Sequence, residues 1–310
     1  MTIKRQFVWI GLAIMVAANP ALPASSPNSA GVPAQMVITV EPVHHGSVRE
    51  ELQPRDVTVV EHNTNLPVVH LQRLAGDLAN MQLFVFLDDS TRSSSLGLHI
   101  PELRTFLKAL PPTTQVAVGY MRNGTFALAQ AFTTDHEKAA SALRLPLAMP
   151  GENGSPYFGL SDLVKHWPSK ESTGRKAVLA LTDGVDRYYD ARTVDDPYVD
   201  TAIQDALKKG VAVYSIYLRG AGIYGRGGWV TNVAQSRLME LSEETGGYAY
   251  FEDFSDPVAI APFLSDFADR LDNQYLMTFK ALNGHGVEPV KLRTELPGLK
   301  IEGPSRIYVK

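Results

Sequence analysis

Two adjacent carboxylates and a run of hydroxyl side chains follow a continuous apolar stretch, and these residue types could form a metal or ligand site. Residues 83–87 are all apolar strand formers, a pattern typical of a strand covered on both faces. Asp88 and Asp89 follow directly, and the hydroxyls after them are Ser90, Thr91, Ser93, Ser94 and Ser95. Open α/β sheets place their ligands at the carboxyl ends of strands. Hard oxygen donors at such an end would suit Mg²⁺, Mn²⁺ or Ca²⁺.

Length, charge and cysteine content limit the class of protein. The chain has 310 residues, 45% hydrophobic and 20% charged, which is enough for one large domain or two smaller ones. The formal charge of −4, without a basic run, argues against nucleic acid as a partner. The sequence contains no cysteine, so no disulfide can form and the fold must be held by its core.

The first residues have the pattern of an export signal. Lys4 and Arg5 precede an apolar run over residues 7–18, and residues 22–24 (Leu-Pro-Ala) resemble a signal-peptidase site. The run is shorter than the ~20 residues of a membrane-spanning helix. We therefore predict a cleaved signal peptide over residues 1–24, with no membrane span after cleavage and a periplasmic or secreted product. An uncleaved anchor is the alternative, and residues 25–35 are expected to be a flexible leader.

Helical and strand patterns alternate through the middle of the chain. Strands are expected at residues 81–87, 115–120, 125–132, 176–181, 211–218 and 248–251. Helices are expected at residues 101–110, 134–143, 156–167, 201–209, 235–245 and 257–271. The alternation predicts an α/β fold with a doubly wound, mostly parallel sheet, and the Asn123–Gly124 turn predicts one antiparallel hairpin at its edge.

Both ends of the chain have β patterns. Residues 36–75 contain three short strand-like runs, which need a partner sheet to be stable. Residues 273–310 contain further alternating runs that could supply it. We predict that these two segments pair in a small β-sandwich or β-sheet domain, with the domain of residues 80–272 inserted between them.

Three motifs should meet at one edge of the parallel sheet, because parallel strands present their carboxyl ends to the same side. They are Asp88-x-Ser90 after the first strand, Gly154-Ser155-Pro156 before a helix, and Thr182-Asp183-Gly184 after the fourth strand. The set resembles the von Willebrand factor A (VWA) domain, a Rossmann-like fold with a metal-ion-dependent adhesion site. The resemblance covers residues 80–272, including the turn at 245–247.

The resemblance implies a particular ligand set and function. It implies protein binding and one divalent cation, Mg²⁺ or Mn²⁺ before Ca²⁺, held by Asp88, Ser90, Ser155 and Asp183. A partner's acidic residue would complete the coordination. Residues 56–61 and 273–279, which flank the domain, are similar to segments of exported bacterial VWA proteins of the acidobacterial type.

One residue departs from the motif. Arg92 stands at the fifth position, where the family has a serine ligand, and a guanidinium has no acceptor for a metal. If Arg92 points inward it could pair with Asp88 and Asp183 and leave the site metal-free. If the loop bulges, Ser93 could move into the ligand position. Both versions of the site remain open at this point.

Two predicted loops have the composition of contact surfaces. Residues 186–200 and 219–232 are rich in Tyr, Trp and Arg, the side chains that carry binding energy at interfaces. Mobility of the glycine-rich loop is the alternative interpretation. The candidate partner-binding residues are Arg92, Asp186, Tyr188, Tyr189, Tyr224, Arg226 and Trp229.

Motifs for catalysis are missing from the sequence. There is no Gly-x-Ser-x-Gly elbow, no cysteine nucleophile and no His-Glu-x-x-His helix. We therefore predict that the protein is not an enzyme but an exported protein-binding or adhesion-type module. The alternative is a structural or assembly factor of the cell envelope that acts through its β-domain, with Arg92 in place of a metal ligand.

Overall fold

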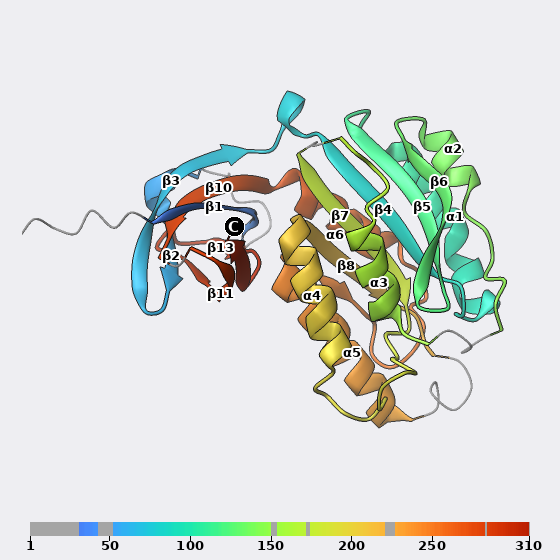
Figure 1. The fold of residues 1–310 in the computed structure, drawn as a ribbon. Helices are drawn as coiled ribbons and strands as arrows, with labels where there is room; N and C mark the ends of the chain where they lie inside the picture. Colours follow the sequence, from blue (N-terminus) through green and yellow to red (C-terminus); the bar gives the residue numbers. More distant parts are fainter. Residues whose placement is uncertain are drawn as a thin grey trace, which may run out of the picture. The chain divides into compact units, whose positions relative to one another are not determined.

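The fold is seen in a computed structural model that describes residues 31–42, 52–149, 154–171, 174–220, 227–282 and 284–309. The predicted signal peptide, most of the predicted leader, Tyr224 and Arg226 lie outside the described residues. In this part of the chain the strands form two six-stranded sheets and one two-stranded sheet (Figure 1).

The central sheet has the order β6-β5-β4-β7-β8-β9, with β6 antiparallel to β5 and the other neighbours parallel. Its strands are β4 (Met81–Asp88), β5 (Thr114–Arg122), β6 (Thr125–Thr133), β7 (Arg175–Thr182), β8 (Val211–Tyr217) and β9 (Ala249–Tyr250). β4 lies in the middle and every one of its residues is buried. Leu83, Val85 and Leu87 join the core on one face of the sheet, and Phe84 and Phe86 join the core on the other.

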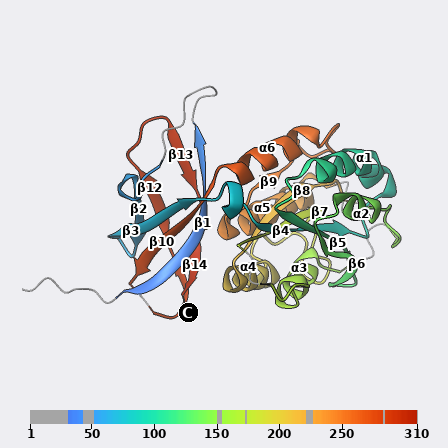
Figure 2. The same ribbon diagram turned by 90° about the horizontal axis from the view of Figure 1, so that it is seen from above.

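Helices cover both faces of this sheet. α1 (Ser93–Ala109), α2 (His136–Ser141) and α6 (Ala261–Asp272) contribute to one core, and α3 (Pro156–Lys165), α4 (Pro197–Lys209) and α5 (Gly228–Thr245) contribute to the other. Figure 2 shows α1 and α6 on one side of the sheet and α3 and α4 on the other. The predicted doubly wound α/β fold with one antiparallel edge hairpin is therefore confirmed.

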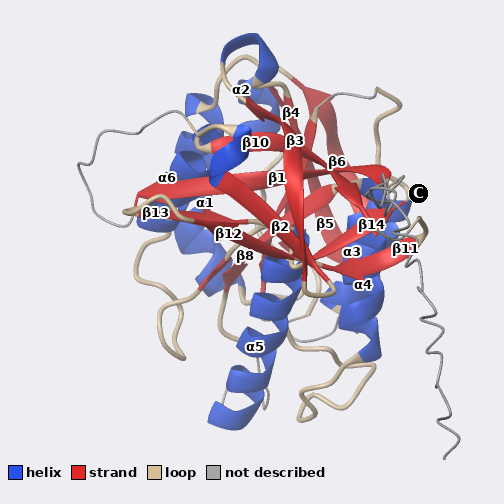
Figure 3. Cartoon of the chain, turned by 90° about the vertical axis from the view of Figure 1, so that its left-hand side faces the viewer, coloured by secondary structure: helices blue, strands red, loops and turns tan. Residues whose placement is uncertain are grey.

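The second six-stranded sheet joins the two ends of the described chain, in the order β12-β2-β3-β10-β1-β13 (Figure 3). Its strands are β1 (Val32–Pro42), β2 (Val57–Glu61), β3 (Thr64–Arg73), β10 (Gln274–Ala281), β12 (Lys291–Thr294) and β13 (Leu299–Glu302). β11 (Gly286–Pro289) and β14 (Arg306–Val309) form the two-stranded sheet, and the short 3-10 turns η1 (Pro54–Asp56) and η2 (Gly76–Leu78) precede β2 and β4. Ile38, Val59 and Phe279 are fully buried in a third core, so the β-domain predicted from both termini is present.

Four elements begin at least four residues earlier than the sequence predicts. β1 begins at Val32, inside the predicted leader, because its first residues pair with the end of β10. Val32 lies opposite Ala281, and Ala34 lies opposite Phe279. α1 begins at Ser93 instead of Pro101. Its first turns are held by the buried Leu96 and Ile100, so the proline lies inside the helix.

The other two are α4 and α5, which begin at Pro197 and Gly228 instead of Thr201 and Gln235. The start of α4 does carry a local signal, because Asp196 is its N-cap and Pro197 its first residue. The start of α5 has no side-chain cap and depends on burial. In the described part of the chain, no helix has the length and apolar character needed to cross a membrane.

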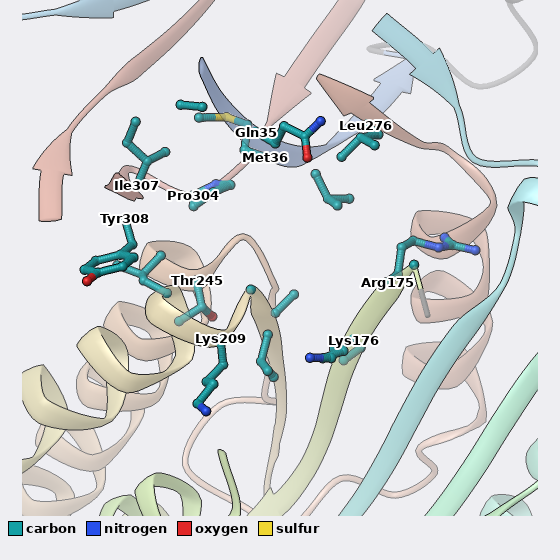
Figure 4. A pocket seen from close by; sticks show the side chains of 18 of the residues that line it. Gln35, Met36, Arg175, Lys176, Lys209, Thr245, Leu276, Pro304, Ile307 and Tyr308 are labelled. Carbon is teal, nitrogen blue, oxygen red and sulfur yellow. The ribbon is translucent and has the colours of Figure 1, made fainter. Parts of the chain in front are cut away.

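A cavity of about 590 Å³ lies at the amino ends of β7 and β8, beside the β-domain (Figure 4). Its walls include Met36, Leu276 and Lys176. The guanidinium of Arg175 is turned away from it, as Figure 4 shows, and donates to the Leu271 carbonyl at 2.6 Å. This cavity is at the end of the sheet opposite to Asp88, so it is separate from the predicted site.

Candidate functional site

The carboxyl ends of β4 and β7 bring the predicted acids together. Asp88 is the last residue of β4, Asp183 follows β7, and Ser155 is the N-cap of α3. We call the loops at this edge, residues 88–92, 143–149, 154–156 and 183–196, the rim. The predicted metal ligands Asp88, Ser90, Ser155 and Asp183 are at most 2% exposed, so they lie beneath the surface of the rim.

Asp88 is held by hydroxyl groups and by its own loop. The Ser90 amide and hydroxyl donate to Asp88 Oδ1 at 2.9 and 2.8 Å, and the Thr182 hydroxyl donates to Oδ2 at 2.9 Å. Burial and the charge of Asp183 raise the pKa of Asp88, while the bonds from Ser90 and the charge of Arg187 act against them. Nearby donors and positive charge therefore favour the ionised form of Asp88 against the effect of burial.

Arg187 supplies that positive charge. Its Nη2 lies 2.5 Å from Asp183 Oδ2 and its Nη1 lies 3.4 Å from Oδ1, a two-point contact with one carboxylate. The Arg187 side chain is 7% exposed, so the ion pair is buried. It comes from the loop after β7, four positions beyond Asp183.

The sequence interpretation gave this role to Arg92, and the structure gives it to Arg187. Arg92 is the half-exposed N-cap of α1, and no described residue forms an ion pair or side-chain hydrogen bond with it. Ser93 is exposed in the first turn of α1, away from a ligand position. The motif spacing carried no signal for Arg187, because its contact with Asp183 depends on the backbone path of the loop after Gly184.

The loop after β7 folds over the loop before α3. The Ser155 hydroxyl donates to Asp186 Oδ2 at 2.6 Å, and Asp186 Oδ1 accepts the Tyr188 and Tyr189 amides at 2.7 and 3.0 Å. The Arg187 amide donates to the Gly154 carbonyl at 2.5 Å. A Cβ at position 154 would lie 2.0 Å from the Tyr188 ring, so only glycine allows this approach. Asp186 is thus a buried organiser of the loop, although the sequence placed it among the contact residues.

Asp89 has a separate structural role that the sequence did not reveal. Its side chain is fully buried. Arg144 contacts its two oxygens at 2.6 and 3.2 Å, and the Leu147 amide donates to it at 3.0 Å. The Arg144 guanidinium also lies 3.7 Å from the centre of the Tyr120 ring. This pair holds residues 143–149 against the loop that follows β4.

Aromatic and apolar side chains are exposed above the buried network. Tyr188, Tyr189 and Trp229 are 57%, 38% and 61% exposed, and Trp229 Nε1 donates to the Arg192 carbonyl at 3.0 Å. Trp229 lies in the first turn of α5, so the part of the predicted 219–232 loop from Gly228 onward is helical. Leu147 and Met149 are exposed on the loop that Asp89 anchors. Large exposed apolar side chains on rigidly held loops are typical of interaction surfaces.

The described residues do not fit a divalent cation in this arrangement. The two oxygens of Asp183 face the guanidinium of Arg187, which carries donors only. Ser155 directs its proton to Asp186. A dication among these ligands would be next to a buried positive charge, and Mg²⁺ tolerates little departure from octahedral geometry.

No protein-family model matches the chain, and no curated protein matches it in sequence. Similar solved structures include an aerotolerance-related membrane protein from Bacteroides fragilis, 10% identical over 62% of this chain and 99% of that chain, with a TM-score of 0.45. BatB from Bacteroides thetaiotaomicron is 14% identical over 62% of this chain and 98% of its own, with a TM-score of 0.42. The vWF domain of the type V pili tip protein Mfa5 from Porphyromonas gingivalis is 10% identical over 62% and 94%, with a TM-score of 0.43.

These similarities concern the path of the chain, and they transfer no residue role. The chain's own strand order carries the fold assignment: β6-β5-β4-β7-β8-β9 is the doubly wound order with its hairpin strand at one edge. The central domain therefore has the doubly wound α/β fold that the sequence predicted.

Proposed function

We propose that this protein is a protein-binding module that contacts its partner through the rim. The observation that carries the proposal is the exposure of Tyr188, on a loop fixed from below by a buried ion pair and hydrogen bonds, and of Trp229, which lies in the first turn of α5 and is bonded to the same loop at Arg192. Tyr and Trp supply large contact areas at a small cost in conformational entropy. A fixed loop loses little further freedom on binding, which favours affinity.

The proposal includes export to the periplasm or beyond and assigns the protein no catalytic step. Export is supported by the basic and apolar pattern of residues 1–24. The buried rim acids support a binding role without catalysis, because their oxygens are bonded within the fold. Asp88, Asp89 and Asp183 each accept hydrogen bonds from neighbouring side chains. In these positions they stabilise loops.

The experiment compares a rim variant with a variant of the β-domain. The rim variant is Tyr188→Ser/Trp229→Ser, and the matched control is Val69→Ser, which removes an exposed apolar side chain from β3. Each purified protein is immobilised, and proteins retained from an envelope extract of the source organism are quantified. We expect the partner retained by wild type to fall at least about tenfold for the rim variant and to be unchanged for Val69→Ser.

The opposite pattern would support the alternative function. A structural factor acting through its β-domain should keep its partner in the rim variant and lose it in Val69→Ser. Thermal unfolding of the three proteins serves as the control for folding. Val69→Ser should leave the midpoint nearly unchanged. The rim variant loses the packing of Tyr188 on Gly154 and the Trp229 bond to Arg192, so it must still unfold cooperatively above the assay temperature for its loss of partner to count.

A further inference from the structure

We infer that the guanidinium of Arg187 takes the place of a divalent cation at the rim, so that the partner meets a closed, metal-independent surface. What the inference says about the partner rests on the proposed function. The replacement of a cation by Arg187 does not, and it is tested without a partner. It concerns a residue whose role the sequence motif does not indicate.

The first argument is the balance of charge around Asp183. Asp88 and Asp183 are both buried, and their mutual repulsion must be offset by positive charge. Asp89 also lies at this edge, but it is paired with Arg144. Arg187 contacts Asp183 through its guanidinium, and both side chains are buried. It therefore performs the electrostatic task of a cation.

The second argument is that the backbone holds Arg187 inside the site. Its amide donates to the Gly154 carbonyl. On one side of it, Asp186 accepts the Ser155 hydroxyl, and on the other side the Tyr188 ring packs against Gly154. Arg187 Nη1 also donates to the Val185 carbonyl at 3.1 Å. The guanidinium is consequently part of the folded rim, and a cation would have to displace it and reorganise the loop.

The consequence concerns the chemistry of the partner. A carboxylate from a partner cannot complete a coordination sphere at a site that is buried and where the oxygens of Asp183 already contact Arg187. The side chains that such a partner meets are the rings of Tyr188, Tyr189 and Trp229. We therefore expect an apolar or aromatic partner segment and binding that is unaffected by a chelator.

The test is calorimetric titration of Mg²⁺ and Mn²⁺ into four proteins: wild type, Arg92→Ser, Arg187→Ser and Arg92→Ser/Arg187→Ser. Arg92→Ser restores the serine of the family motif, while Arg187→Ser removes the guanidinium from Asp183. We expect wild type and Arg92→Ser to give no saturable heat. Arg187→Ser should bind metal with a Kd of about 1 mM or tighter, and the double variant should bind at least as tightly.

Two results would overturn the inference. One is metal binding by wild type as tight as by Arg187→Ser, and the other is the absence of binding in both variants that lack Arg187. Arg187→Ser/Asp183→Ala is the control for the position of the metal, and it should lose the heat that Arg187→Ser gains. Arg144→Ser is the matched control, because it breaks the other arginine–aspartate pair of the rim and should gain no metal binding that depends on Asp183.

A folding defect would still give a decisive result. If Arg187→Ser unfolds at low temperature in chelator, Mn²⁺ should raise its melting temperature by several degrees and leave wild type unchanged; no rise would count against the inference. Arg187→Lys keeps the charge and should fold and remain metal-free. These outcomes are independent of the pull-down, so a failed partner assay contradicts the proposed function without affecting the role of Arg187.

Discussion

Replacing Arg237 by alanine is expected to lower the free energy of unfolding by about 3–5 kcal/mol, because it leaves a buried carboxylate without its cation. Arg237 lies on α5 with 1% of its side chain exposed, and its Nη1 is 3.1 Å from Asp196 Oδ2. Its Nη2 donates to the Asp190 and Thr193 carbonyls at 3.0 and 2.5 Å. One side chain thus ties the loop between β7 and α4 to the core.

Urea denaturation followed by circular dichroism measures this loss, and a double-mutant cycle isolates the ion pair. Asp196 also caps α4 by accepting the Tyr198 amide at 2.9 Å, so Asp196→Ala should be destabilising on its own. We expect Arg237→Ala/Asp196→Ala to cost less than the sum of the single variants, since neither partner is then left buried alone. A cost below about 1 kcal/mol for Arg237→Ala would show that the loop does not depend on this pair.

The second large effect is expected at Arg270, where α6 meets the β-domain. Its guanidinium lies 2.7 Å from Asp266, 2.9 Å from Glu41 and 2.6 Å from Glu302, and it stacks 3.8 Å from the centre of the Tyr248 ring. Arg270→Met keeps the apolar stem and removes the charge. We expect it to cost about 3 kcal/mol at neutral pH, because three carboxylates then face one another without their shared cation.

The loss at Arg270 should depend on pH in a defined direction. Burial raises the pKa of Glu302, but hydrogen bonds from Lys300 and Arg270 outweigh it and leave that pKa below its usual value. A carboxyl with a lowered pKa adds stability above its unfolded-state pKa, and this contribution disappears as the pH falls through the folded-state value. The difference between wild type and Arg270→Met should therefore be largest near neutral pH and shrink below a pH of about 4.

Urea denaturation of both proteins across this pH range tests the direction. Taking the difference between the two proteins matters because burial raises the pKa of Glu41, which acts in the opposite sense in wild type. A difference that stays constant from neutral to acidic pH would mean that Arg270 contributes by packing on Tyr248 and not by its charge.

Local pattern in the sequence was sufficient to predict most of the central sheet. The apolar run before Asp88 predicted a strand buried on both faces, and that strand is the middle of the sheet. The Asn123–Gly124 turn predicted the edge hairpin, where Asn123 has a φ of 52° and Gly124 a φ of 73°. Both signals depend only on a few neighbouring residues, so the strand and the hairpin can be predicted without knowing the fold.

The beginnings of several elements could not be predicted in this way. α1 starts before Pro101 because Leu96 and Ile100 are buried against the sheet, and β1 starts at Val32 because β10 offers it a partner. A proline or a small-residue leader is weak local evidence against structure. Packing contacts from distant parts of the chain outweigh it.

The sequence by itself determined that Asp88, Ser155 and Asp183 would lie together, because parallel strands end at one side of a sheet. Only the tertiary structure decided which positive charge contacts Asp183. Gly184 adopts a φ of 65°, and the chain after it turns so that Arg187 reaches back to Asp183 while Arg92 stays at the start of α1. Which of two arginines enters a buried site depends on loop backbone angles and on charges brought from separate strands. Neither is encoded in the spacing of a motif.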